Sequence, residues 1–341
     1  MNVPAARGEL SEQVFARLRD EPRSLGTWAQ FDAVEGDDFQ VTLFVLQELS
    51  YRRIDGVRAE WEDEPSLLAL RAGLEAAQER RLRESLRLPR CRPAEVGDAL
   101  VRMLDDADGP SLSAWVEENA TLEHLREFVT HRAAYQLKEA DPHSFAIPRL
   151  RAGVAKTALL EIQLDEYGHH EPSEAHAELF RATLEALGLD PDEANIVDLL
   201  PEPTLRTNTV LNSFARSRRL LGACLGHLAV FEMTSVEPMA RYASACRRLL
   251  HGARATQAAR FFDVHVAADG LHQRIALERL VGGFAAQYPD EASELLFGAA
   301  ALMAIEGELA EHLLSSWADG RTSLRRPLPT SVVSLRVSSA A

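Results

Sequence analysis

Helical periodicity runs through nearly the whole sequence, and no other feature constrains the fold as strongly. In segments such as SLLALRAGLEAAQERRLRESL, apolar residues recur every three or four positions among Ala, Arg and Glu. Proline and glycine separate such segments, and nearly all of them lack the alternating pattern of an exposed β-strand. The sequence therefore predicts an all-α protein in which long helices with short connections form a bundle.

The character of these segments changes along the chain and predicts three parts. Residues 1–110 carry charged amphipathic helices and end near the turn-like stretch DDADGPSLS. Residues 111–319 carry longer and more apolar helices. Residues 320–341 contain two prolines and five serines without a periodic apolar face. We expect an accessory N-terminal helical layer, a helical bundle domain and a loose C-terminal tail.

Composition excludes several classes of partner. The 341 residues are 46% hydrophobic, which suffices for a packed core, and their formal net charge is −15. Nucleic acids and anionic membranes would require a cationic face, so neither is expected as a partner. No apolar run reaches about 18 residues, and the first residues do not resemble a signal peptide. Three cysteines without C-x-x-C spacing suit a reducing compartment, so a cytoplasmic protein is expected.

One predicted helix combines metal-ligating side chains with an apolar surface. In FFDVHVAADGLHQRI, His265, Asp269 and His272 stand at i, i+4 and i+7, which places them within about 60° of one another on a helix. The remaining surface of this helix is almost entirely apolar, so the helix is expected to be buried. Buried charges must be paired or bound to a metal, and this pattern favours a metal site.

Two carboxylates on other apolar segments are candidate ligands for the same site. Glu232 is the only charged residue in ACLGHLAVFEMTS, and its alternative role is an ion pair with Arg218 or Arg219. Glu166 borders the apolar face of LLEIQLDEYG, and its alternative role is that of a surface carboxylate at a helix end. Both would converge on the histidine-bearing helix if the bundle closes around a metal.

The histidine that accompanies Glu166 has two candidates. Glu166 and His169 form E-x-x-H, the i, i+3 pair by which di-iron bundles direct a carboxylate and an imidazole at one metal. His176 is ten residues from Glu166, about 15 Å along an unbroken helix. Gly168 and Pro172 lie between them and could break the helix so that His176 folds back. Spacing alone favours His169.

Four motifs, in order along the chain, carry a resemblance to a known family. KEADPHSFAIPRL, EIQLDEYG with a later histidine, GHLAVFEMTS and H-x-x-x-D-x-x-H span about residues 120–280. This ordered set resembles the haem-oxygenase-like di-iron oxidases and oxygenases, often described as iron-containing redox enzymes. The resemblance implies a haem-oxygenase-type helical fold that binds two non-haem irons in place of haem.

The resemblance also implies which residues bind iron. It favours His176 over His169, because members with the DEYG motif take a histidine from the next helix. It suggests Glu139, in the KEADPH motif, as the first carboxylate, with Glu127 as the alternative and a surface charge before Pro142 as the other role of Glu139. The expected iron ligands are Glu139, Glu166, His176, Glu232, His265, Asp269 and His272.

The expected function combines the ligand types with the resemblance. Carboxylates and imidazoles without thiolate suit iron or manganese, with open positions for O₂ as co-substrate. The family implies a small-molecule substrate, namely an amine, amino acid or fatty acid, that undergoes N-oxygenation, desaturation or oxidative C–C cleavage with the help of an electron donor. G-x-S-x-G, H-E-x-x-H and glycine-rich phosphate loops are absent, which excludes hydrolases, zinc proteases and kinases. No acid, base or nucleophile separate from the metal ligands is expected.

Two other readings of the sequence remain open. One is a non-catalytic or haem-linked metal-binding protein on the same scaffold, and the other is a helical interaction module. Seven candidate ligands on four helices disfavour the interaction module, because their buried charges would need pairing without a metal. Association into a homodimer is also left open. His227, five residues before Glu232, is expected to support the ligands from behind rather than to bind metal.

Overall fold

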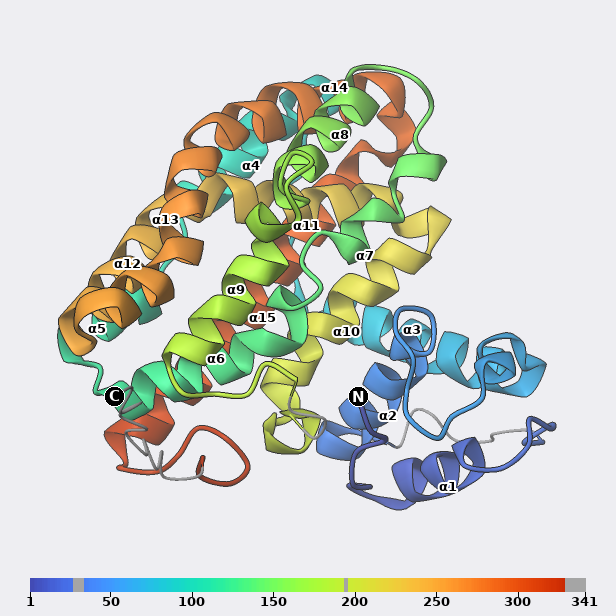
Figure 1. Cartoon of the computed structure of the whole chain (residues 1–341). Helices are drawn as coiled ribbons and strands as arrows, with labels where there is room; N and C mark the ends of the chain where they lie inside the picture. Colours follow the sequence, from blue (N-terminus) through green and yellow to red (C-terminus); the bar gives the residue numbers. More distant parts are fainter. Residues whose placement is uncertain (27–33, 193–195, 329–341) are drawn as a thin grey trace, which may run out of the picture.

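The computed structural model describes residues 1–26, 34–192 and 196–328. Helices account for the regular structure of these residues, and the single β-type pairing among them is an isolated bridge between Asn2 and Asp55. The predicted all-α fold is therefore confirmed, and Figure 1 shows long helices arranged as a bundle.

The first three helices form a layer with its own core at one corner of the molecule (Figure 1). They are α1 (Glu9–Leu18), α2 (Gly36–Glu48) and α3 (Pro65–Ser85). Their buried side chains, such as Phe44 and Leu70, pack in one core with residues of α10 (Glu202–Arg216). These three helices all lie within residues 1–110, the region that the sequence predicts as accessory.

The bundle begins before residue 111. α4 (Val96–Asp105), which the sequence places with the accessory region, buries Val96 and Leu100 in the main core and packs against α15. The other bundle helices are α5 (Leu112–Asn119), α6 (Leu122–Gln136), α7 (Asp141–Ser144), α8 (Val154–Glu166), α9 (His176–Ala186), α11 (Leu221–Thr234), α12 (Val236–Leu249), α13 (Gly252–Arg274), α14 (Gly282–Gln287) and α15 (Ala292–Ala318).

α11 and α15 pack closely against each other, and glycines permit this contact. A Cβ atom at Gly226 would overlap the backbone of Leu295, and a Cβ atom at Gly298 would overlap the backbone of Ala223. Because each glycine faces the main chain of the other helix, the two axes approach more closely than larger side chains would allow. This contact holds α11, and with it Glu232, against the centre of the bundle.

Helical periodicity runs without interruption through residues 112–140 of the sequence, but the structure divides this segment into two helices and a turn. α5 ends at Asn119, and the Thr121 side chain then caps α6 by accepting a hydrogen bond from the His124 backbone N–H at 3.2 Å. α6 itself ends at Gln136. Glu139 therefore lies in a turn after α6 rather than on the helix.

The residues after α15 return to the bundle. The Glu127 carboxylate accepts hydrogen bonds from Thr322 and from the backbone and hydroxyl of Ser323. Leu324 is buried in the core of the N-terminal layer. The start of the predicted tail is thus packed against both parts of the protein, and the remainder, from residue 329, lies outside the described residues.

Within the described residues, no helix on its own combines the length and the hydropathy that a membrane span needs. The bent pair Arg218–Thr234 and Val236–Leu249, with 55° between its halves, meets the requirement by length and composition only.

Candidate metal centre

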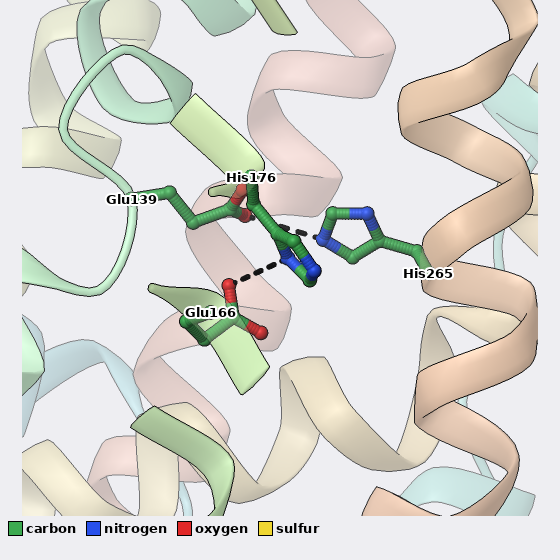
Figure 2. Close-up of side chains that lie close together, drawn as sticks. All are labelled: Glu139, Glu166, His176 and His265. Carbon is green, nitrogen blue, oxygen red and sulfur yellow. Dashed lines mark ion pairs between the residues drawn. The ribbon is translucent and has the colours of Figure 1, made fainter. Parts of the chain in front are cut away.

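Six of the seven predicted ligands meet in the interior as two groups that share one carboxylate. Within each group, one ligand atom from each residue lies within 4.8 Å of the corresponding atoms of the others. Figure 2 shows four of these side chains converging from separate segments. The first group contains Glu139, Glu166, His176 and His265, and the second contains Glu166, Glu232 and His272.

A tight turn between α8 and α9 brings two of these ligands together. Glu166 is the last residue of α8 and His176 is the first residue of α9. Gly168 has φ 77°, and a Cβ there would lie 2.5 Å from the backbone nitrogen of Ala175. The chain therefore reverses at the glycine, and His176 Nδ1 comes to 2.8 Å from Glu166 Oε2 (Figure 2).

The two alternative ligands lie outside the cluster. The His169 side chain is 63% exposed and pairs with Asp165 at the surface. Glu127 is occupied by hydrogen bonds from the C-terminal segment and from Trp317 Nε1 at 2.9 Å. The structure thus brings His176 and Glu139 to the cluster, although spacing alone favours His169.

Glu139 is directed inward by the turn that follows α6. Ala140 adopts φ 73°, a left-handed conformation that is unfavourable for a residue with a Cβ. The Gln163 side-chain amide donates a hydrogen bond to the Ala140 carbonyl at 2.9 Å and holds this turn. Glu139 Oε1 consequently lies 3.6 Å from His265 Nε2 (Figure 2).

The predicted face of α13 is buried and points at the cluster. His265, Asp269 and His272 are at most 4% exposed. His265 Nδ1 is 2.9 Å from the Phe261 carbonyl, which can only accept, so Nδ1 carries the proton of the neutral ring. In this neutral form the Nε2 lone pair faces Glu139 and is available to a metal.

His272 lies between carboxylates on both of its ring nitrogens. Nδ1 is 3.0 Å from Glu232 Oε2, and Nε2 is 2.6 Å from Asp165 Oδ2. A metal-binding imidazole commonly donates its second N–H to a carboxylate that fixes the ring. Asp165 fits this positioning role, and sequence reasoning missed it although it precedes Glu166 in the same motif.

Asp269 lies beside the second group rather than inside it. Its Oδ2 accepts a hydrogen bond from the Ser235 hydroxyl at 2.5 Å, and its Oδ1 is 3.4 Å from His272 Nδ1. Asp269 therefore differs from the other six predicted ligands, because the Ser235 hydroxyl already donates to one of its carboxylate oxygens.

Burial alters the protonation of the cluster. It raises the pKa of Glu166 and of Glu232 to about 7 each. Burial alone would lower the pKa of His265, but Glu139 and Glu166 outweigh it and raise that pKa to about 10. The pKa of His272 rises to about 11 for a similar reason. In the metal-free protein the cluster therefore holds protons, which a divalent cation would displace on binding.

Several buried atoms of the cluster lack hydrogen-bond partners within the described part of the chain. Leaving such an atom unpaired costs about 1–3 kcal/mol. Glu166 Oε2 and His176 Nδ1 are close, but their orientation does not allow a hydrogen bond. Lone pairs that converge in this way fit a cation with oxygen and nitrogen ligands, such as iron. The unpartnered atoms are Glu139 Oε2, Glu166 Oε2, His176 Nδ1 and Asp269 Oδ1.

A cavity of about 370 Å³ adjoins the cluster. Glu139, Glu166, Glu232 and His265 form part of its wall, so the predicted ligands face the space in which a small molecule would lie. Most of the wall is apolar. Its Phe and Tyr side chains are Phe128, Tyr135, Phe180, Phe231, Tyr242, Phe261 and Phe262.

His227 has a different neighbour from the one expected. Its Nδ1 lies 3.4 Å from Nε2 of His143, another buried histidine, which also lines the cavity. Burial lowers the pKa of both residues, so the pair is neutral. His227 therefore packs behind His143, a residue of the cavity wall, and not behind Glu232.

Comparison with known proteins agrees with this geometry. Residues 126–307, just over half of the chain, match the family model described as iron-containing redox enzyme. The match runs from α6 into α15 and includes every residue of the two groups. No curated protein matches the sequence significantly. The chain belongs to the haem-oxygenase-like family of iron-containing redox enzymes.

Proposed function

We propose that this protein is a non-haem di-iron oxidoreductase that uses O₂ to oxidise a small molecule. The observation that carries the proposal is that Glu166 belongs to both donor groups. One carboxylate can bridge two metal ions in this way, as in other carboxylate-bridged helical bundles. Membership of an iron-containing redox family supports iron as the metal.

The two groups define how the chain would hold the irons. Glu139, His176 and His265 would bind the first iron, and Glu166 would be shared between the two. Glu232 and His272 would bind the second, and Asp269 Oδ1 lies close enough to join them. Ferrous ions bound here would supply electrons to O₂, and an external electron donor would return them to the ferrous state.

The remaining residues of the site control access and orientation. The aromatic wall keeps water away from the cluster and leaves a space suited to a small organic substrate. Asp165 accepts a hydrogen bond from His272 Nε2–H and so fixes the orientation of the ring. Since the substrate is not defined by the ligands, it must be recognised by the cavity wall.

Metal stoichiometry tests this proposal directly. After anaerobic loading with ferrous iron, the full chain should bind about two irons, and exposure to O₂ should oxidise them with uptake of O₂. Glu166→Ala should reduce the bound iron to below one per chain, because both groups lose their shared ligand.

His169→Ala is the matched control, since this histidine lies in the same turn but is exposed. It should retain both irons. One iron per chain in the unmodified protein, or undiminished iron in Glu166→Ala, would contradict the dinuclear assignment. Stoichiometric haem binding with a Soret band that survives His265→Ala would favour the haem-linked alternative.

A further inference from the structure

An ion pair lies in the wall of the cavity. Arg132 on α6 donates from both terminal nitrogens to the two carboxylate oxygens of Glu306 on α15, at 2.8 and 2.6 Å. The side chains are 19% and 22% exposed, and both line the cavity that also contacts the metal cluster. The pair is therefore accessible to a bound molecule and poorly accessible to bulk water.

Arg132 is the only lysine or arginine among the described residues that line this cavity. The other charged residues in the wall are acidic or belong to the cluster. An anionic group on a ligand therefore has a single protein cation to contact. Burial opposes the charge of Arg132, but Glu306 raises its pKa, so the pair remains ionised.

The pair has unused hydrogen-bonding capacity. A guanidinium has five N–H donors, and Arg132 uses two of them on Glu306. No described residue accepts a hydrogen bond from Arg132 Nε. Each Glu306 oxygen accepts one hydrogen bond from Arg132 and retains a second lone pair. The free N–H groups of Arg132 can donate hydrogen bonds to a ligand, and the free lone pairs of Glu306 can accept them.

The pair and several of the candidate metal ligands line the same cavity. Arg132 lies on α6, and Glu139 lies seven residues later in the turn that follows this helix. Tyr135 lies between them in sequence, lines the cavity and stacks on Phe231 with ring centroids 5.7 Å apart. A molecule with a charged end at Arg132 and an apolar chain along these rings would reach the cluster.

We propose that Arg132 and Glu306 bind the carboxylate and ammonium groups of a zwitterionic, amino-acid-like substrate whose apolar side chain extends to the metal cluster. A monoanion would meet repulsion from Glu306, and a monocation would meet repulsion from Arg132. A zwitterion satisfies both members of a neutral pair at once. The assignment names the substrate class of the proposed oxidase and rests on that proposed function.

Three related probes test the charge pattern, namely L-norleucine, hexanoate, which lacks its ammonium group, and pentylamine, which lacks its carboxylate. Their binding to the full chain is measured by calorimetry, without metal and after anaerobic iron loading. Norleucine should bind at least tenfold more tightly than either singly charged probe. Equal affinities, or no detectable binding of norleucine in either state, would overturn the assignment.

Variants separate recognition from folding. Arg132→Met with Glu306→Leu removes both charges and keeps apolar volume, a replacement that is often neutral for stability. It should abolish the preference for norleucine while retaining two irons per chain. Arg206→Gln is the matched control, because Arg206 pairs with Glu308 on the same helix but at the surface, at 2.6 Å.

The outcomes distinguish the two proposals. Retained iron and O₂ uptake without any norleucine preference would remove the zwitterion assignment and leave the di-iron oxidase intact. A norleucine preference that depends on Arg132 in a protein that binds no iron would support the recognition site and remove the oxidase. A preference that persists in the double variant would show that other residues recognise the charges.

Discussion

Two adjacent carboxylates at the end of α8 have different surroundings. Glu166 is buried and belongs to both donor groups, whereas the Asp165 side chain is 21% exposed and contacts His272 from the outer side. A carboxylate behind a metal-binding imidazole fixes the ring and increases its basicity. One residue can therefore act as a shared ligand while its neighbour orients a ligand of the second group.

Asp165→Asn should weaken the binding of the second iron and leave the binding of the first iron unchanged. The amide oxygen can still accept a hydrogen bond from His272 Nε2 but carries no charge, so we expect a loss of about 10- to 100-fold in affinity for one iron. Titration with ferrous iron against a competing chelator should resolve one tight and one weakened site. His169→Ala, which removes the other partner of Asp165, should leave both sites tight. Two unchanged affinities in Asp165→Asn would contradict the positioning role.

The buried histidine pair makes stability depend on pH. Burial lowers the pKa of His143 to about 3, from its ordinary value of 6.5. Below pH 6.5 the unfolded chain binds a proton at this residue that the folded chain does not, so the free energy of unfolding falls as the pH falls toward 3. At pH 5 this one residue should cost about 2 kcal/mol.

Replacement of His143 should therefore flatten the acid limb of the stability profile. We expect metal-free His143→Asn to lose about 2 kcal/mol less than the unmodified protein between pH 7 and pH 5. Urea denaturation at each pH measures the difference, with His251→Asn, at an exposed site, as the control. Parallel profiles for His143→Asn and the unmodified protein would show that His143 does not remain neutral when folded.

At the scale of elements, two turns and one helical face create the cluster. The turn at Gly168 joins α8 to α9, the turn at Ala140 follows α6, and α13 contributes a continuous helical face. α13 then continues as a π-helical segment, Ile275–Val281, a geometry that is frequent near functional sites. The contact of α11 with α15 fixes the depth at which Glu232 enters.

The contact between α11 and α15 predicts opposite effects on stability when two different glycines of α15 are replaced by alanine. Gly298→Ala should destabilise the protein by about 1–3 kcal/mol, because the new methyl group would overlap the backbone of α11. Gly307→Ala, on the same helix with no atom near its Cβ, should stabilise by about 0.5–1 kcal/mol. Chemical denaturation measures both. A stable Gly298→Ala variant would mean that the two helices can separate without loss of packing.

Across the whole molecule, the N-terminal layer reaches the site through a buried ion pair. Lys138, directly before Glu139, pairs with Glu48 at the end of α2, and both side chains are at most 8% exposed. The Lys138 ammonium also lies 4.5 Å from the centroid of the Tyr51 ring. The layer therefore contacts the turn that carries the first ligand, although it lies outside the residues that match the family.

Removing one member of the Lys138–Glu48 pair should lower the free energy of unfolding substantially. Lys138→Met leaves Glu48 buried without its partner, and we expect a loss of about 3–5 kcal/mol in the free energy of unfolding. Lys138→Met combined with Glu48→Leu should recover most of that loss, because neither charge remains. Denaturation of the unmodified protein, Lys138→Met, Glu48→Leu and the double variant measures the coupling in a double-mutant cycle. Equal losses in the single and double variants would show that packing, not charge, accounts for the effect.

Local patterns predict the helices better than their ends. Apolar periodicity continues across Ala120 and across Gln136, so the break before α6 and the turn before Glu139 do not interrupt it. Glu127 and Glu139 are therefore hard to distinguish by spacing. The position of the turn separates them, since it brings Glu139 to His265 and leaves Glu127 with the C-terminal segment.

The sequence by itself determined the all-α class, the buried face of α13 and the donor types of the site, because periodicity and apolar context are local properties. The resemblance supplied His176 and Glu139, and their roles as ligands remain predictions. Only the tertiary structure decided that Glu166 is shared, that Asp165 lies behind His272 and that Arg132 and Glu306 face the cavity. Each of these relations joins residues on different helices, so it depends on packing that no local spacing encodes.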